Sequence, residues 1–380
     1  MADQGQLPPL PPLTIGEYTL PVPIIQGGMG VRVSAHNLAA AVANEGGLGI
    51  IATVALSLAS KHYKKAKDYF RANVKALVDE LTWAREKSPN GLIGVNCMVA
   101  IRDYEDMVRT SVEHGAQVVI SGAGLPLRLP EYAASNPKTA LVPIVSSLRA
   151  ASLLAKRWHK TYKRLPDAMV FEDPNTAGGH LGTSREKLFT PEYSTEVVLP
   201  QLAEWSRKEY NDEIPIITAG GIWDRKDIDH AFSLGAKGVQ MASRFICTHE
   251  CDAMDAFKQV FIDAKPSDVI IVDSPAGLPG RALKTTFTTD LMRGEEVAKK
   301  CIATCLTECR CREEEETFCI AYALHQAQQG NMDHGLVFTG SNAVRHTHMM
   351  HVWEIFEELT GQKSPSAHLR PQPVDNVTEA

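Results

Sequence analysis

The amino-acid sequence predicts an α/β fold, specifically a (β/α)₈ barrel with a mainly helical C-terminal appendage. Eight short apolar runs alternate with longer segments of helical periodicity. Most runs are almost continuously apolar, such as Val-Val-Ile at residues 118–120, which is typical of parallel strands buried on both faces. Glycines follow several of the runs, where barrel loops build a site. A doubly wound open sheet is the structural alternative, because alternation alone does not show closure.

The eight expected strands cover residues 23–26, 48–53, 92–98, 118–121, 140–146, 168–171, 215–219 and 238–241. Helices are expected at residues 35–45, 148–160, 197–209 and 224–234. Ser34 is the expected N-cap of the first helix, which ends before Gly46 and Gly47, and the last of these helices ends at Gly235. Residues 56–87 are expected to form an enlarged helical excursion after the second strand.

The chain is expected to divide into four parts. They are a flexible N-terminal tail (1–20), the barrel (21–295), a helical, cysteine-rich segment packed on the barrel (296–361) and a loose tail (362–380). The last part is polar and contains Pro365, Pro371 and Pro373, which disfavour a packed core.

Composition narrows the class of protein. The chain has 380 residues, 44% of them hydrophobic, and a formal net charge of −6, so neither nucleic acid nor an anionic membrane surface is an expected partner. No stretch approaches the roughly 20 apolar residues of a membrane span. The N-terminus lacks the basic start and apolar run of a signal peptide, so we expect a cytoplasmic protein. Its eight cysteines are then better interpreted as thiols or ligands than as a disulfide framework.

Glycine and small residues at the strand ends indicate a phosphate site. They are Gly178 and Gly179 after the sixth strand, Gly220 and Gly221 after the seventh, and Ala242 and Ser243 after the eighth. Such residues let backbone N–H groups approach an anion closely. For any single pair, a tight βα turn is an equally good explanation. The chain lacks a strand–GxGxxG–helix unit with a suitably spaced acidic residue, so a mononucleotide is favoured over a dinucleotide.

Six motifs in fixed order resemble the nitronate monooxygenase family. They are Pro-Ile-Ile-Gln-Gly-Gly-Met (23–29), Ala-Asn-Glu-Gly-Gly-Leu-Gly (43–49), Gly-Val-Asn (94–96), Ala-Gly-Gly-His-Leu-Gly (177–182), Ala-Gly-Gly-Ile (219–222) and Ser-Arg-Phe (243–245). The likeness runs from about residue 21 to residue 281. This family also contains FMN-dependent enoyl-ACP reductases and some NADH:quinone reductases.

The resemblance implies FMN as cofactor and assigns its contacts. The Gly27–Gly28–Met29 turn would contact the flavin ring, Asn96 the ring or ribityl chain, and Ser146 the pyrimidine edge. The remaining expected cofactor-binding residues, mostly around the phosphate, are Gly178, Gly179, Gly220, Gly221, Ala242 and Ser243. The family usually has Gly-Thr where this chain has Ala242-Ser243, but the hydroxyl and the small size are kept.

His180 is the expected catalytic base. The family motif carries a histidine there that removes a proton from a nitroalkane, and a neutral imidazole suits that task near neutral pH. The resulting nitronate then passes electrons to the flavin, which reacts with O₂. The alternative is that His180 only binds the phosphate or the flavin edge. Glu172 and Asp173 either orient His180, bind a cation or polar substrate group, or form a solvated loop pair.

Three C-terminal features stay open to interpretation. Cys301, Cys305 and Cys309 would share one face of a helix, and with Cys311 and Cys319 they either bind zinc or an iron–sulfur cluster or remain thiols. The spacings match none of the standard CxxC patterns. His346, His348 and His351 lack the spacing of a helical zinc motif and are expected at the surface. The loop at residues 273–281 is expected to close over the site.

Nitronate monooxygenase activity on nitronates or nitroalkanes with O₂ is the leading function. An NAD(P)H-dependent reductase of an enoyl thioester or quinone is the first alternative, and a non-catalytic flavin-binding protein is the second. An acyl carrier protein as partner would require a basic patch on this chain. The only candidate is more simply interpreted as an exposed helix face; it consists of Arg149, Lys156, Arg157 and Lys160. A homodimer is an expectation by analogy alone.

Overall fold

Eight parallel strands close into a barrel in this computed structural model, which describes residues 7–295, 301–313 and 318–366. The strands are β3 (Ile24–Gln26), β4 (Leu48–Ala52), β5 (Leu92–Met98), β6 (Val118–Gly122), β7 (Ala140–Val145), β8 (Met169–Glu172), β10 (Ile216–Ala219) and β11 (Gly238–Met241). They follow one another around the barrel in chain order, and β11 pairs with β3 to complete the ring. The predicted barrel is therefore confirmed, and the open-sheet alternative is wrong.

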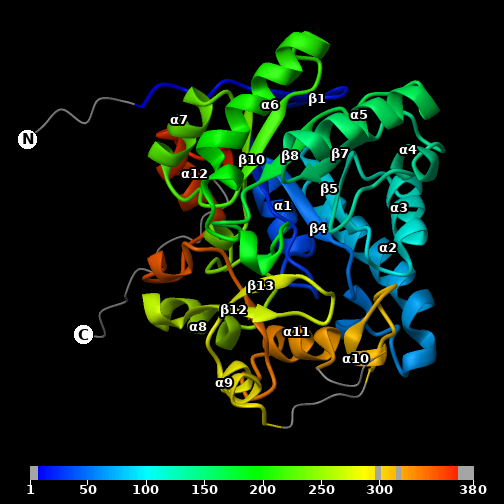
Figure 1. Ribbon diagram of the computed structural model, residues 1–380, viewed down its shortest axis with the longest axis vertical. Coiled ribbons are helices and arrows are strands. Elements are labelled where there is room, and N and C mark those ends of the chain that lie inside the picture. The colour runs from blue at the N-terminus through cyan, green and yellow to red at the C-terminus, as the bar shows by residue number, and fades with distance from the viewer. Residues whose placement is uncertain (1–6, 296–300, 314–317, 367–380) are drawn as a thin grey trace, which may run out of the picture.

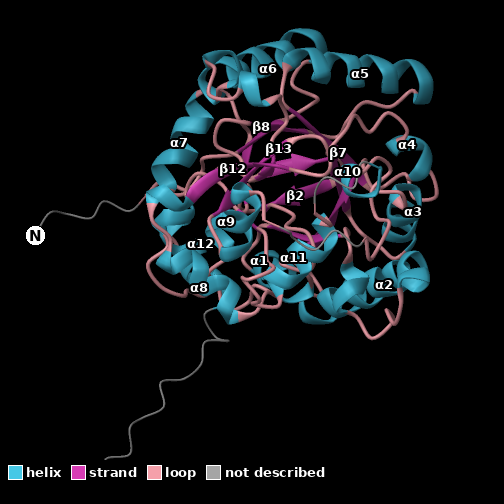
Figure 2. Ribbon diagram, turned by 60° about the horizontal axis from the view of Figure 1, so that its bottom comes forward, coloured by secondary structure: helices cyan, strands magenta, loops and turns pink. Residues whose placement is uncertain are grey.

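Helices surround the strands (Figure 2). The helices are α1 (His36–Asn44), α2 (Tyr69–Lys87), α3 (Tyr104–Glu113), α4 (Leu129–Tyr132), α5 (Leu148–Tyr162), α6 (Thr195–Tyr210), α7 (Arg225–Ser233) and α12 (Val352–Thr360). The last of them, α12, packs against both α7 and α1 and so occupies the place of the eighth barrel helix. The excursion expected at residues 56–87 consists of two short 3₁₀ turns followed by α2.

The described residues between β11 and α12 (242–295, 301–313 and 318–351) form what we call the roof. Its elements are α8 (Asp255–Asp263), β12 (Val269–Asp273), β13 (Pro279–Leu283), α9 (Thr286–Arg293), α10 (Arg310–Glu313), α11 (Ile320–Gln328) and β14 (Val337–Phe338). Figure 1 shows these elements together at one end of the barrel. Strand β13 pairs with β12 on one edge, and with β14 and β9 (Gly179–His180) on the other. The C-terminal part is thus helical as expected, with a small sheet that was not.

The N-terminal residues seal the opposite end of the barrel. Strands β1 (Leu13–Ile15) and β2 (Tyr18–Leu20) form an antiparallel hairpin around Gly16, which has a positive φ of 59°. Leu13, Ile15 and Leu20 are fully buried in the cluster that fills the barrel interior. The expectation of a flexible tail over residues 1–20 is therefore wrong for residues 13–20, because their alternating apolar side chains plug the barrel. Residues 1–6 lie outside the described residues.

The start of α1 corrects a second expectation. Ser34 does not cap this helix, since its hydroxyl is hydrogen-bonded to the backbone of Met29. The carboxylate of Asp252 instead accepts hydrogen bonds from the backbone N–H groups of Ala35 (2.9 Å), Asn37 (3.2 Å) and Leu38 (3.2 Å). A roof residue therefore satisfies the free N–H groups of the first helical turn.

Of the C-terminal part expected to be a loose tail, residues 367–380 lie outside the described residues. Within the described part of the chain, no helix has both the length and the apolar character needed to cross a bilayer.

Candidate active site

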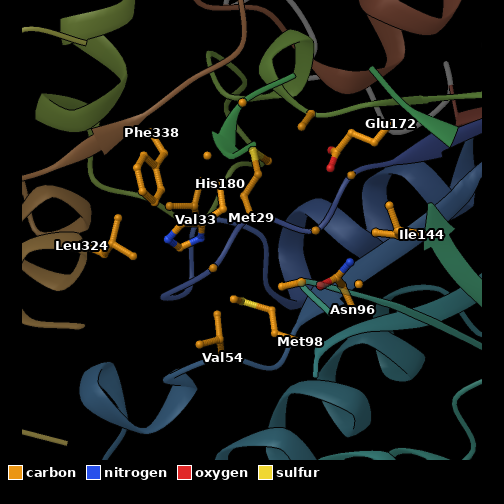
Figure 3. Close-up of a pocket in the computed structure, with 18 of the residues that line it drawn as sticks. Met29, Val33, Val54, Asn96, Met98, Ile144, Glu172, His180, Leu324 and Phe338 are labelled. Carbon is orange, nitrogen blue, oxygen red and sulfur yellow. The ribbon is translucent and has the colours of Figure 1, made fainter. Parts of the chain in front are cut away.

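A cavity of about 470 Å³ lies between the carboxyl ends of the strands and the roof. Its barrel side is lined by residues that follow β3, β4, β5, β6, β7, β8 and β11, and its roof side by residues of α11, β14 and neighbouring loops. Figure 3 shows His180 and Phe338 at one side of this cavity, with Glu172 and Asn96 at another. Every expected site residue lines the cavity except Gly220 and Gly221.

The turn after β3 forms one wall of the cavity. A Cβ on Gly28 would lie 2.4 Å from the Cβ of Asn96, and one on Gly27 would lie 2.9 Å from the Cβ of Ala242. The turn therefore requires glycine because it packs directly against the ends of two other strands. Ser34 fixes the next residue by accepting a hydrogen bond from the backbone N–H of Met29 at 2.9 Å.

The loop after β8 is held from both sides. Asp173 is buried and accepts hydrogen bonds from the backbone N–H groups of Asn175 (2.8 Å) and Thr195 (2.9 Å). Arg281 of β13 is also buried and donates to the carbonyl oxygens of Ala177 and Asn175. Asp173 is thus neither part of a solvated pair nor in contact with His180. It shapes the loop that carries the histidine.

His180 sits where this loop joins the roof sheet. Its backbone pairs with Gly280 of β13, and its ring lies edge-on to Phe338 with centroids 5.1 Å apart. Its Nε2 is 2.7 Å from the hydroxyl of Ser274, which follows β12. Burial lowers the pKa of His180 to about 4, so the imidazole is neutral at physiological pH. The predicted closure of the 273–281 loop over the cavity is confirmed, since Ser274 contacts His180 and Leu278 lines the wall.

Two more polar side chains face the cavity. Burial raises the pKa of Glu172 to about 7, close to the pH at which its charge would change. The Oε1 atom of Gln240 is buried, and no hydrogen-bond partner for it exists among the described residues. An unsatisfied buried acceptor on a cavity wall is free to bind a ligand donor.

The far end of the cavity carries the expected phosphate residues. Gly178, Gly179, Ala242 and Ser243 line it, together with Thr339 and Gly340 of the roof. The backbone N–H of Gly340 donates to the Ser243 hydroxyl at 3.0 Å.

Gly220 and Gly221 stand behind this wall. Both have positive φ, and their Cα atoms approach Thr176 so closely that a Cβ on Gly220 would lie 2.8 Å from its hydroxyl. Gly221 accepts a hydrogen bond from the Asn342 side chain at 2.8 Å. In this structure they make a tight turn that supports the wall.

The C-terminal histidines do not form a surface cluster. His346 is buried between Trp223 and Phe261 and bonds the carbonyl oxygen of Ser243 at 2.8 Å. His348 is exposed, and His351 pairs with Glu250 at 2.8 Å. His346 thus supports the turn that carries Ser243, which could not be inferred from its spacing in the sequence.

The helix expected to align the cysteines is also absent. Residues 301–309 lie outside any helix, and α10 begins only at Arg310. All eight cysteines are described, and none forms a disulfide. The basic run on α5, by contrast, is an exposed helix face as expected.

Sequence reasoning missed Gln240, Arg281, Phe338 and Ser274 as parts of the site. Gln240 had a usable signal, because a polar residue near the end of a buried strand needs a partner. The other three come from the roof, and the antiparallel pairing that brings them to His180 leaves no periodic trace in the sequence.

Comparisons with known proteins identify the family of this chain. A family model described as nitronate monooxygenase matches residues 13–362. The chain is 29% identical over 272 residues to the (3aS,4S,5R,7aS)-5-hydroxy-7a-methyl-1-oxo-octahydro-1H-indene-4-carboxyl-CoA dehydrogenase of Mycobacterium tuberculosis, covering 72% of this chain and 66% of that protein. It is 26% identical over 284 residues to a probable nitronate monooxygenase of Bacillus subtilis, covering 70% of this chain and 78% of that protein. Among solved structures, FabK from Thermotoga maritima is similar with a TM-score of 0.67 and 26% identity, over 89% of this chain and 91% of that one.

Proposed function

The chain belongs to the nitronate monooxygenase family of oxidoreductases, and on this premise we propose that it oxidises alkyl nitronates with FMN and O₂. Neutral nitroalkanes would be substrates through His180 as base. The observation that carries the proposal is the neutral, half-buried His180 on the wall of a glycine-lined cavity, with Nε2 fixed by Ser274.

The cavity fits FMN in three respects. Its volume of about 470 Å³ suits a small-molecule site. Gly27 and Gly28 line the cavity and carry no side chain, so they present only backbone atoms to it, as a flat ring would require. Gln240 offers an unpaired buried acceptor. Bound here, FMN would supply the electron-transfer chemistry of the oxidation.

The residues that would hold FMN follow from their positions on the wall. Gly27, Gly28, Met29, Asn96 and Ser146 would contact the ring and its side chain. The phosphate would lie against Gly178, Gly179, Ala242 and Ser243, with Gly220 and Gly221 supporting that wall through Thr176 and Asn342.

The neutral His180 imidazole can accept a proton. In the proposed tautomer, Nε2–H donates to the Ser274 hydroxyl, which also accepts from the backbone N–H of Ala276 at 3.2 Å. Nδ1 then keeps its lone pair, and none of the described residues forms a hydrogen bond with it. A proton from the carbon next to a nitro group would move to Nδ1. A nitronate has already lost that proton and does not need this step.

The test is anaerobic stopped-flow absorbance of the purified protein, mixed separately with a nitronate, NADH and NADPH. Bleaching of the flavin absorbance by the nitronate, without a response to either nicotinamide, is expected. Rapid bleaching by NADH or NADPH and none by the nitronate would overturn the proposal.

A pair of substrates tests the role of His180. His180→Ala is expected to keep FMN and to oxidise a nitronate at a rate near that of the wild type. Its rate with the parent nitroalkane should fall by a factor on the order of 10² to 10⁴, the usual contribution of a positioned base. Normal turnover of the neutral nitroalkane by this variant would show that His180 is not the base.

A second function is favoured by two of the relatives. The mycobacterial protein is named as a dehydrogenase of a carboxyl-CoA thioester, and FabK from Thermotoga maritima is among the similar solved structures. The alternative is an NAD(P)H-dependent reductase of an enoyl thioester or quinone, and the nicotinamide arms of the stopped-flow experiment discriminate it from the first.

A further inference from the structure

The roof presents an apolar surface to the cavity. Helix α11 and the segment around β14 are joined there, because the backbone N–H of Leu336 donates to the carbonyl oxygen of Ala323 at 3.1 Å. The residues of α11 that line the cavity are three or four positions apart, so they share one side of the helix. The set that we call the apolar wall consists of Leu306, Ile320, Ala321, Leu324, Leu336 and Phe338.

The apolar wall lies next to the expected base. The ring of Phe338 is edge-on to that of His180, with centroids 5.1 Å apart. Figure 3 shows Leu324 and Phe338 on the His180 side of the cavity and Glu172 on the opposite side. A substrate whose reacting carbon lies at His180 therefore has the apolar wall within reach of the rest of its chain.

The cavity offers no cation to a charged substrate group. Among the described residues, neither a lysine nor an arginine lines it, and Glu172 is its one aspartate or glutamate. Arg281 of β13 is turned away from it, since its guanidinium donates to the carbonyl oxygens of Ala177 and Asn175. A carboxylate carried into this cavity would lose its hydration without gaining a counter-ion, which is unfavourable.

We propose that the apolar wall binds a hydrocarbon chain of the substrate. The protein then selects nitronates and nitroalkanes with a long uncharged chain over those that carry a second charged group. The nitro group as the reacting part rests on the proposed function, whereas the hydrocarbon chain follows from the wall itself.

Leu324 is the residue of the wall that we expect to determine this selectivity. It is half-buried, whereas its neighbours Ile320 and Ala321 on α11 are almost fully buried. Its side chain therefore keeps more apolar surface for a ligand to cover, and covering apolar surface is favourable.

Packing within the roof does not explain the wall. Core side chains are covered by other side chains and leave few voids larger than a water molecule, whereas these residues border a cavity of about 470 Å³. A wall that served only to cover the flavin would leave the rate independent of the length of the substrate. The dependence on chain length therefore separates the two explanations.

The first measurement is oxygen consumption with the nitronates of nitroethane, nitrobutane, nitrohexane and nitropropionate. A factor of about four in kcat/KM is expected for each added methylene, the equivalent of about 0.8 kcal/mol per buried CH₂. Nitrohexane should then exceed nitroethane by a factor on the order of 10². The nitronate of nitropropionate, which carries a carboxylate, should be the poorest substrate.

The second measurement does not depend on the proposed function. Binding of acetamide, butyramide and hexanamide to the purified full chain is measured by calorimetry, because these neutral amides are not oxidised. Affinity should increase by the same factor of about four per methylene.

The two measurements separate the possible failures. Amide binding that grows with chain length, without oxidation of any nitronate, would refute the proposed function and support the apolar wall as a chain site. Amide binding that does not grow with chain length would overturn this inference, and oxidation of all the nitronates at similar rates would do the same while the proposed function stands.

Variants of Leu324 test the assignment of selectivity. Leu324→Arg should lower kcat/KM for the nitrohexane nitronate and raise it for the nitropropionate nitronate, each by about tenfold, because a guanidinium pairs with the carboxylate. Leu324→Ala adds no charge and should only reduce the advantage of nitrohexane over nitroethane. Leu153→Arg is the matched control, since Leu153 is a 51% exposed leucine on α5 that does not line the cavity. Unchanged selectivity in both Leu324 variants, or the same change in Leu153→Arg, would contradict the assignment.

Discussion

Replacing Ser274 by alanine would remove the contact that fixes the His180 ring. The two side chains are 94 positions apart and meet only because β9 pairs with β13 beside the β12–β13 hairpin. Their hydrogen bond of 2.7 Å holds the proposed tautomer, with the proton on Nε2. Without the hydroxyl, either ring nitrogen could carry that proton, and Nδ1 would lose its advantage as an acceptor.

The expected loss of rate can be estimated from the cost of leaving a hydrogen-bonding group without its partner. Leaving one polar group of a buried pair unsatisfied costs about 1 to 3 kcal/mol. At about 1.4 kcal/mol per factor of ten, this range is roughly a 5- to 150-fold change in rate. We expect a loss of about tenfold, toward the lower end, because the pairing of β9 and the packing on Phe338 still hold the ring.

The assay is oxygen consumption at saturating and low substrate, with a nitroalkane and with its nitronate. Ser274→Ala should slow turnover of the nitroalkane and leave that of the nitronate within about twofold. Ser274→Thr keeps the hydroxyl and should restore most of the rate. Asp273→Asn is a control in the same hairpin, since Asp273 forms only an exposed ion pair with Arg185.

Two results would refute the reasoning. An unchanged rate of Ser274→Ala with the nitroalkane would show that the hydroxyl does not fix the base. Equal slowing with both substrates would show that the hairpin had moved, so that the contact is structural only.

Four further predictions follow from the same structure. Activity with a neutral nitroalkane should persist below pH 6.5 and be lost only as the pH falls through about 4, because burial lowers the pKa of His180 to about 4; a pH–rate profile with an acid limb near 6.5 would contradict this. Since burial raises the pKa of Glu172 to about 7, the apparent KM for an anionic nitronate should rise as the pH increases through 7, and Glu172→Gln should abolish that rise. Asp252→Ala should destabilise the fold by about 2 kcal/mol, measured by urea unfolding, because it leaves three N–H groups of α1 without their acceptor. Gly28→Ala should cost about 1 to 3 kcal/mol and lower the flavin content of the purified protein, since the added methyl group would meet the Cβ of Asn96 at 2.4 Å; unchanged stability and flavin content would show that the turn can adjust.

The barrel could be predicted from the sequence because its strands are buried on both faces. All five residues of β6 are buried, which is why the strand begins with the apolar run Val-Val-Ile. The expected strand ends lie within one residue of the observed ones. The hairpin at residues 13–20 carried a signal as well, a short alternating pattern around Gly16, but the prolines before it suggested a tail.

Contacts across long sequence separations could not be predicted. Asp252 caps the start of α1 through the N–H of Ala35, which lies 217 positions earlier, and no local sequence pattern predicts such a partner. For the site, the family motif led directly to His180, whereas Ser274 and Arg281 depend on how the roof sheet pairs. Gly220 and Gly221 show the reverse case. The family motif predicted that they line the cavity, but they lie behind its wall and pack against Thr176.

The position of α12 has a consequence for how the chain folds during synthesis. β11 ends at Met241, but the helix that completes the ring begins at Val352. At the usual pace of translation, about 5 to 20 residues per second, α12 emerges from the ribosome roughly 5 to 20 s after the last barrel strand. During that interval α1 and α7 expose the surfaces that α12 will cover, while the roof can already form. We expect nascent chains halted before residue 352 to recruit chaperones, and the completed barrel to depend on its final helix as a late closing step.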